Sequence, residues 1–262
     1  MKIENNILVS ISPEDIKNGI LEIPFGVTKI GDASCFDMLE LEHIEFPRPN
    51  TIREIGDGAF CRCANLKAVA IPEGVEKIGN NAFSHCIDLK FAHLAESVKT
   101  LGSNSFSRCY ALESINLSRV ENLGNSCFFD CTSLKRASLV YLEKEIPQRC
   151  FENCMHLTSV DISSRVLKIG EKAFYECASL KEVDFDPIKN VKDYTRGLQS
   201  IGNHAFGWCK SLEKIELPAT VLNIGTWAFK GCQNLREIHT ELGREKFDVC
   251  QLDAPEKTEI SK

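Results

Sequence analysis

The chain has 262 residues, of which 43% are apolar and 26% charged, a composition typical of a folded globular protein and not of a disordered or collagen-like one. Its net charge of −6 arises from 37 acidic and 31 basic side chains that are well mixed along the sequence, which argues against nucleic acid or an anionic membrane as the partner. No stretch approaches the roughly 18 to 20 consecutive apolar residues of a membrane-spanning helix.

The amino terminus predicts a cap at the start of the fold and not a signal peptide. Its first residues, MKIENNILVSISPED, include an early glutamate and lack a long apolar run. Ser12, Pro13 and Asp15 form the start signal of a short helix, and Gly19 forms its stop signal. We interpret residues 1–19 as an N-terminal cap. We expect a cytoplasmic protein, or one delivered into a host cell by a route without a classical signal peptide; an exported protein whose signal is missing is the alternative.

A repeat of about 23 residues organises the chain. Aligned on a phenylalanine, the unit reads I-G-x-x-(A/S/C)-F-x-x-C-x-x-L-x-x-(I/V)-x-(I/L)-P. One spacing of 32 residues marks an insert between Pro187 and Ile201. The nine phenylalanines, separated by 24, 23, 23, 22, 23, 23, 32 and 23 residues, are Phe36, Phe60, Phe83, Phe106, Phe128, Phe151, Phe174, Phe206 and Phe229.

Each part of the unit predicts a local structure. The small residue, Phe, Cys and Leu fall at i, i+1, i+4 and i+7, which places them on one side of a short helix or helical turn. The following L-x-x-I-x-I segment alternates as a half-buried strand does, and proline ends it. We predict an α/β repeat solenoid of about nine units over residues 20–240, with a parallel sheet on the concave face and short helices or helical turns on the convex side. Residues 241–262 are expected to form a C-terminal cap or tail.

The repeat pattern I-P-x-x-V-x-x-I-G-x-x-A-F-x-x-C-x-x-L resembles the Treponema-type, or BspA-like, leucine-rich repeat family. The resemblance covers about residues 20–240. It implies a leucine-rich repeat fold in which no part of the repeat motif is catalytic. It also implies the roles of the family's members, which are surface adhesins, host-interaction proteins or binders without a characterised function. Function needs its own argument, because a fold does not determine it.

The thirteen cysteines are interpreted as packing residues, and a metal site is the alternative. Eight lie three residues after a phenylalanine and three lie just before one, so the repeat sets their spacing. A zinc or iron–sulfur site would need a C-x-x-C pair, whereas the chain has only Cys61-x-Cys63 and spacings that follow the repeat. The six histidines form no catalytic or metal motif. We predict reduced thiols, no catalytic site, no metal and no cofactor.

The residues that flank the central Ile or Val of each strand should point away from the core and form the binding face. Its N-terminal part carries an exposed Phe91, and its C-terminal part concentrates acidic residues. The alternatives are an ordinary solvated sheet face and, for the 187–200 insert, a tolerated surface insertion. The predicted partner-binding residues are Phe91, His93, Asn116, Arg136, Asp161, Glu182, Asp184, Tyr194, Arg196, Glu216 and Glu237.

These observations predict a non-catalytic, monomeric scaffold for protein–protein interaction, whose partner has a basic surface. The first hypothesis is a module that acts inside a cell, as a bacterial effector or as a regulator of one. The alternative is a surface adhesin or host-attachment protein of BspA type.

Overall fold

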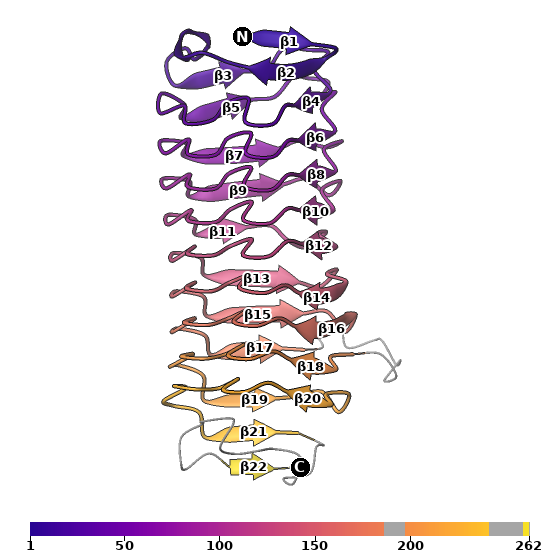
Figure 1. Ribbon diagram of the computed structural model, residues 1–262, viewed down its shortest axis with the longest axis vertical. Coiled ribbons are helices and arrows are strands. Elements are labelled where there is room, and N and C mark those ends of the chain that lie inside the picture. Colours follow the sequence, from indigo (N-terminus) through magenta and orange to yellow (C-terminus); the bar gives the residue numbers. More distant parts are fainter. Residues whose placement is uncertain (186–196, 241–258, 262) are drawn as a thin grey trace. The chain divides into compact units, whose positions relative to one another are not determined.

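The repeats contribute two short strands each, and the two strands lie in different parallel sheets, as the computed structural model in Figure 1 shows. The structure describes residues 1–185, 197–240 and 259–261. The chain divides into two units, Met1–Ser133 and Leu134–Lys262, called here the N-terminal and C-terminal units. In each unit the predicted L-x-x-I segments lie in two short sheets, and the residues that lead up to and include the Ile of Ile-Gly form one further sheet, called here the second sheet. The sequence did not predict the second sheet, because most of its strands are two residues long and too short to show an alternation of apolar and polar residues.

In the N-terminal unit, a hairpin opens the second sheet. Its strands are β1 (Lys2–Glu4), β2 (Ile7–Ser10), β4 (Lys29–Ile30), β6 (Glu54–Ile55), β8 (Lys77–Ile78), β10 (Thr100–Leu101) and β12 (Asn122–Leu123). The predicted strands are β3 (Ile20–Glu22) paired with β5 (His43–Glu45), and β7 (Ala68–Ile71), β9 (Phe91–Leu94) and β11 (Ser114–Ile115) paired in that order. Pro13–Asp15 form a single 3-10 turn, η1, where the sequence predicts a helix start, and the Ser12 backbone N–H donates to the Asp15 carboxylate over 2.8 Å.

In the C-terminal unit, the same two kinds of sheet recur. The predicted strands are β13 (Arg136–Leu139), β15 (Ser159–Ile162) and β17 (Glu182–Asp184), and then β19 (Lys214–Glu216) and β21 (Glu237–His239). β22 (Glu259–Ser261), in the expected C-terminal cap or tail, adds an unpredicted strand beside β21. The second sheet consists of β14 (Lys144–Ile146), β16 (Val166–Ile169), β18 (Ser200–Ile201) and β20 (Asn223–Ile224). Residues 186–196, which include most of the insert, lie outside the described residues.

The segment around each phenylalanine forms tight turns, which corrects the prediction of helices on the convex side. Within the described residues the only helix is η1. Left-handed backbone two residues before and two residues after the ring, as at Asn81 (φ 55°) and His85 (φ 61°), interrupts any helix. Alternate N–H groups also donate to the next repeat, as from Phe60 to the Ala82 carbonyl over 2.8 Å. These donors are unavailable for the bonds to residue i−4 that an α-helix requires.

The phenylalanines stack within each unit, as predicted. Their ring centroids lie 5.2–5.8 Å apart from Phe60 to Phe128, and 5.3–5.5 Å apart from Phe151 to Phe229. All of these rings are fully buried. The long spacing between Phe174 and Phe206 leaves their rings stacked at 5.3 Å. The insert therefore leaves the packing of the ring column intact.

The first repeat places a cysteine, not Phe36, in the ring position. Phe36 is 42% exposed, whereas Cys35 is fully buried. The Cys35 carbonyl accepts a hydrogen bond from the Cys63 thiol over 3.1 Å, as the Phe60 carbonyl does from Cys86 in the next repeat over 3.2 Å. The expected ring at Phe36 is therefore wrong. The ring position lies at a constant distance after the Ile of Ile-Gly, and this distance would have identified it correctly. Cys35 follows Ile30 by five residues, as Phe60 follows Ile55.

The cysteine three residues after the ring position does more than fill space. In seven repeats its thiol donates to the carbonyl of the ring residue one repeat earlier, over 3.1–3.2 Å. Burial raises the pKa of Cys63 to about 12 and that of Cys86 well above its usual range. The thiols are therefore protonated donors at neutral pH, and the twelve cysteines of the described residues are all free.

Removing a mid-column ring should cost far more than removing Phe36. We expect Phe106→Ala to lower the free energy of unfolding by about 3–5 kcal/mol, because it leaves a cavity between two stacked rings. Phe36→Ala, which truncates an exposed ring, should cost under about 0.5 kcal/mol. Chemical denaturation of both variants measures the difference. Equal losses would contradict the assignment of Cys35 to the ring position.

Thiol reactivity should follow burial. In a Cys250→Ser background, which removes the one cysteine outside the described residues, we expect Ellman's reagent to label only the half-buried Cys61 rapidly in the folded protein. All twelve described thiols should react after denaturation. Adding Cys61→Ser is the control, and it should abolish the rapid phase. Several rapidly labelled thiols in the folded protein would contradict the hydrogen-bonded, protonated cysteines described above.

Candidate functional site

The strand face of the N-terminal unit, formed by side chains that β7, β9 and β11 direct away from the core, carries one exposed aromatic ring. Phe91 is 51% exposed and pairs with Ala68 on one side and Ser114 on the other. Because both neighbours are small, the ring is accessible along its sides as well as its edge. His93, also exposed, lies two residues along the same strand. The structure confirms that Phe91 and His93 are exposed side by side on this face, where the sequence predicts an apolar anchor with a polar neighbour.

Asn116 lies next to this anchor, just after β11, and its side chain has a structural role. Its amide nitrogen donates to the Leu94 carbonyl over 3.4 Å. Its amide oxygen accepts from the Ser118 hydroxyl over 2.7 Å. The side chain therefore holds the turn after β11, although it remains exposed.

The strand face of the C-terminal unit is charged, and part of its charge is internally paired. Arg136 in β13 and Asp161 in β15 form an ion pair of 3.4 Å. The next repeat in the same sheet places the exposed Glu182 and Asp184 on β17. Asp161, which is mostly covered, therefore presents less negative charge than its residue type suggests.

A second ion-paired group lies on β19 and β21. The Lys214 ammonium is 2.9 Å from a Glu216 carboxylate oxygen and 3.7 Å from one of Glu237. A hydrogen bond from Lys214, together with its positive charge, lowers the pKa of Glu216, and the reciprocal contacts raise the pKa of Lys214. The acidic cluster predicted from sequence is thus partly neutralised by basic neighbours in the same sheet.

The predicted site residues fall into two groups, one in each unit. Phe91, His93 and Asn116 belong to the N-terminal unit, and the charged residues from Arg136 to Glu237 belong to the C-terminal unit. Tyr194 and Arg196 of the insert lie outside the described residues.

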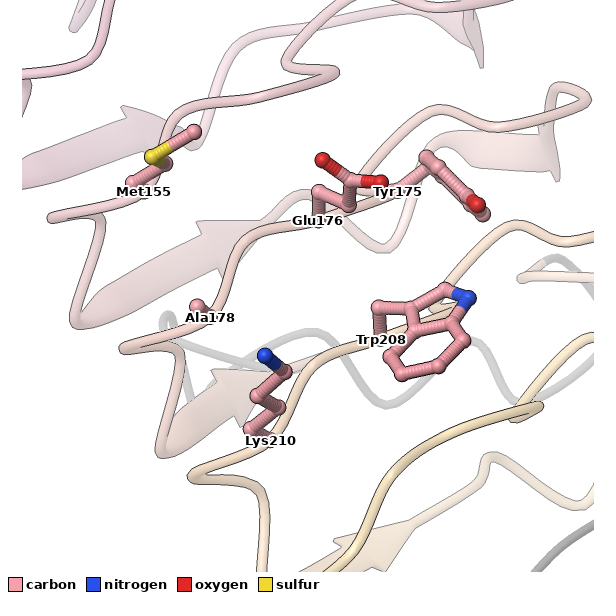
Figure 2. A pocket seen from close by; sticks show the side chains of 6 residues that line it. All are labelled: Met155, Tyr175, Glu176, Ala178, Trp208 and Lys210. Atoms are coloured by element: carbon pink, nitrogen blue, oxygen red, sulfur yellow. The ribbon is translucent and has the colours of Figure 1, made fainter.

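A groove on the turn surface of the C-terminal unit escaped the sequence analysis (Figure 2). Its volume is about 380 Å³. Figure 2 shows the rings of Tyr175 and Trp208 on successive repeats, with Glu176 and Lys210 beside them. We call it the turn groove and define it by its lining residues Met155, Tyr175, Glu176, Ala178, Trp208 and Lys210.

Both tryptophans of the chain lie in this region, on backbone that bulky residues rarely adopt. Trp208 has φ 61° and Trp227 has φ 58°, in positions that other repeats fill with Ala, Gly, Asn, Ser, His or charged residues. His204 contacts both Tyr175 and Trp227, with ring centroids 5.9 and 5.1 Å away. Burial and the nearby lysine charges lower the pKa of His204, so it is neutral at physiological pH. Two tryptophans at positions of left-handed backbone were the sequence signal that could have found the groove.

Neither a metal centre nor a membrane span emerges from the described part of the chain. Across residues 1–185, 197–240 and 259–261, no three His, Cys, Asp or Glu side chains gather in a way that could hold a metal ion. Over the same ranges, no helix combines the length and the apolar character needed to cross a bilayer.

The family described as "BspA type Leucine rich repeat region (6 copies)" matches residues 15–135, 103–198 and 187–253. Together these matches span most of the sequence. No curated protein is significantly similar to the chain.

Solved structures of leucine-rich repeat proteins share the fold. A leucine-rich repeat protein from Bacteroides ovatus is 26% identical with a TM-score of 0.65, and the similarity covers 92% of this chain but 65% of that one. The present chain therefore spans less than two thirds of that relative. A Treponema pallidum leucine-rich repeat protein (19% identity, TM-score 0.54, 94% and 86% coverage) and the pneumococcal vaccine antigen PcpA (18%, 0.52, 93% and 78%) are similar in fold alone.

Proposed function

Because the chain belongs to the BspA-type leucine-rich repeat family, we propose that it is a non-catalytic scaffold that binds another protein through the strand faces of its units. A stacked array of repeats displays a row of side chains that can vary without harming the core. Leucine-rich repeats are built for such recognition, and the chain's own residues must specify the partner.

The observation that carries this proposal is the exposed ring of Phe91 between two small side chains. The exposed part of the Phe91 ring leaves apolar surface in contact with water, and a partner that covers it gains the free energy of burying that surface. Buried aromatic anchors dominate binding energies at protein interfaces, and small neighbours leave room for a complementary ridge. We infer that Phe91 enters a pocket on the partner, with His93 at its rim.

The exposed acids of β17 supply a second element. Glu182 and Asp184 lie on the strand face beside the ion pairs of Arg136 and Lys214. We infer that this strand contacts a basic area of the partner, and that its charge acts mainly on the rate of association. The contribution of Tyr194 and Arg196 in the insert remains a prediction from sequence.

The cysteines favour a role in a reducing compartment. Seven buried thiols act as hydrogen-bond donors, and a donor of this kind exists only in the reduced form. We therefore propose a module that acts in a cytoplasm, either in the bacterium or in a host cell as an effector or a regulator of one. A surface adhesin is the other candidate. Cell fractionation of the source organism separates the two.

Truncating Phe91 should weaken partner binding without affecting stability. Once a partner has been captured with the intact protein, we expect Phe91→Ala to lower affinity by about 2 kcal/mol, or roughly thirtyfold, in a calorimetric titration. Leu39→Ala is the matched control, because Leu39 is 50% exposed on a turn of the same unit. Unchanged affinity of the folded Phe91→Ala protein would place the interface elsewhere.

Removing a charge from β17 should slow association. We expect Glu182→Gln to lower the association rate several-fold at low salt and to reduce the dependence of that rate on ionic strength. Stopped-flow mixing measures both, with Glu40→Gln, a change of the same charge on the N-terminal unit's turn surface, as the control. An unchanged rate in Glu182→Gln would argue against a basic partner surface at β17.

A further inference from the structure

The turn groove is built by substitutions that occur together in successive repeats. Tyr175 directly follows a ring residue, and the same position in the next repeat is Gly207. A Cβ on Gly207 would lie 2.9 Å from the Tyr175 ring. Likewise, a Cβ on Gly231 would lie 2.7 Å from the ring of Trp208, which occupies the same position one repeat earlier. Each aromatic ring is thus seated on a glycine that the next repeat provides for it.

These close contacts with glycine hold the rings of Tyr175 and Trp208 in fixed positions on the surface. The glycine backbone covers one side of each ring, and a lysine contacts each ring as well, with the Lys172 ammonium 5.6 Å from the centroid of the Tyr175 ring. The Lys210 ammonium lies 5.7 Å from the centroid of the Trp208 ring. A lysine in such an exposed contact is held weakly and can move toward a ligand. Met155, which is 44% exposed, and Ala178 complete the apolar part of the lining.

The polar groups of the groove are available, in contrast to their equivalents in the N-terminal unit. There, residues in the position of Glu176 pair with one another along the turns, as Arg62 does with Asp37 over 3.0 Å and Arg108 with Asp130 over 3.5 Å. Within the part of the chain that the structure describes, Glu176 and Lys210 take part in no ion pair or side-chain hydrogen bond. The groove therefore offers an acceptor and a donor that no side-chain hydrogen bond or ion pair of the described residues occupies.

We propose that the turn groove is a second binding site, distinct from the strand faces, and that it binds a neutral sugar unit of a glycan. A hexose has an apolar C–H face that packs on an aromatic ring, and a rim of hydroxyl groups that both donate and accept. Glu176 accepts from such hydroxyls and Lys210 donates to them. The volume of about 380 Å³ is in the range of small-molecule sites, roughly 300–1,000 Å³.

Charge and backbone bonding both favour this ligand. The carboxylate and the ammonium give the pair no net charge and can polarise a neutral hydroxyl, whereas an anion would face repulsion from Glu176 and a cation would face repulsion from Lys210. An extended peptide would need free backbone groups to bind as an added strand. The N–H groups of Glu176 and Trp208 already donate to the carbonyls of Gly207 and Lys230. The groove thus offers side chains and not a sheet edge.

Tryptophan fluorescence tests the proposal directly. The chain has two tryptophans, so Trp227→Gly leaves Trp208 as the sole reporter. The probes are cellotriose, maltotriose, mannotriose and the trimer of N-acetylglucosamine, with trigalacturonate as the anionic counterpart and a neutral proline-rich peptide as the non-sugar counterpart. We expect a saturable change in Trp208 emission with at least one neutral trisaccharide, and none with trigalacturonate or the peptide.

Matched variants locate the binding. Trp208→Gly introduces the residue that the repeat pattern itself uses at Gly231, and Trp227→Gly introduces the one used at Gly58, so both should fold. In a calorimetric titration, Trp208→Gly and Glu176→Ala should each lower the affinity for the same trisaccharide about tenfold or more, and Trp227→Gly should leave it unchanged. The proposal would be overturned if none of the four neutral trisaccharides changed the Trp208 emission, or if trigalacturonate or the peptide bound more tightly than they do. It would also be overturned if Trp208→Gly bound the trisaccharide with the affinity of the unchanged protein.

Discussion

The contact between aromatic rings of successive repeats is the interaction on which the rest of the structure depends. Neighbouring strands of a sheet lie about 4.8 Å apart, and the stacked rings follow this spacing with centroids 5.2–5.8 Å apart. One repeat cannot bury such a ring alone, so each repeat is stable only against its neighbours. The two residues with left-handed backbone around each ring let the chain turn tightly enough to direct the ring into the core. The same turns direct every second backbone N–H group toward a carbonyl of the next repeat.

The cysteines belong to the same arrangement. A ring residue's carbonyl accepts a long backbone hydrogen bond within its own repeat, as at Phe60 from the Cys63 N–H over 3.3 Å, and it has room for a second donor from the next repeat in a small space. A thiol fits that space, tolerates burial better than a hydroxyl, and supplies a weak donor. This accounts for a cysteine at a fixed distance after the ring without any ligand or redox chemistry. Burial raises the pKa of these thiols, as at Cys63, where the value reaches about 12, so they remain protonated donors.

With the core held constant, surface positions of the same repeat can take on different chemistry. On the strand faces, Phe91 stands among small residues in one unit, whereas Arg136 and Asp161 form an ion pair in the other. On the turns, charged residues such as Asp37 and Arg62 pair along the N-terminal unit, whereas aromatic rings seated on glycines replace them near Trp208. The chemistry of the surface therefore varies along the chain even though its backbone repeats.

The sequence by itself determined the repeat, its period, the strand register of the displayed face and the exposure of Phe91, because these follow from a pattern that recurs nine times. It could not distinguish a helical stripe from a pair of tight turns, since both place Phe and Cys on the same side. Only the tertiary structure decided that Cys35 replaces Phe36 in the core, that Arg136 and Lys214 neutralise nearby acids, and that Trp208 lines a groove. The reason is that these features depend on contacts between repeats, where a side chain's neighbours lie about 23 residues away in sequence and their orientation is set by the turn backbone.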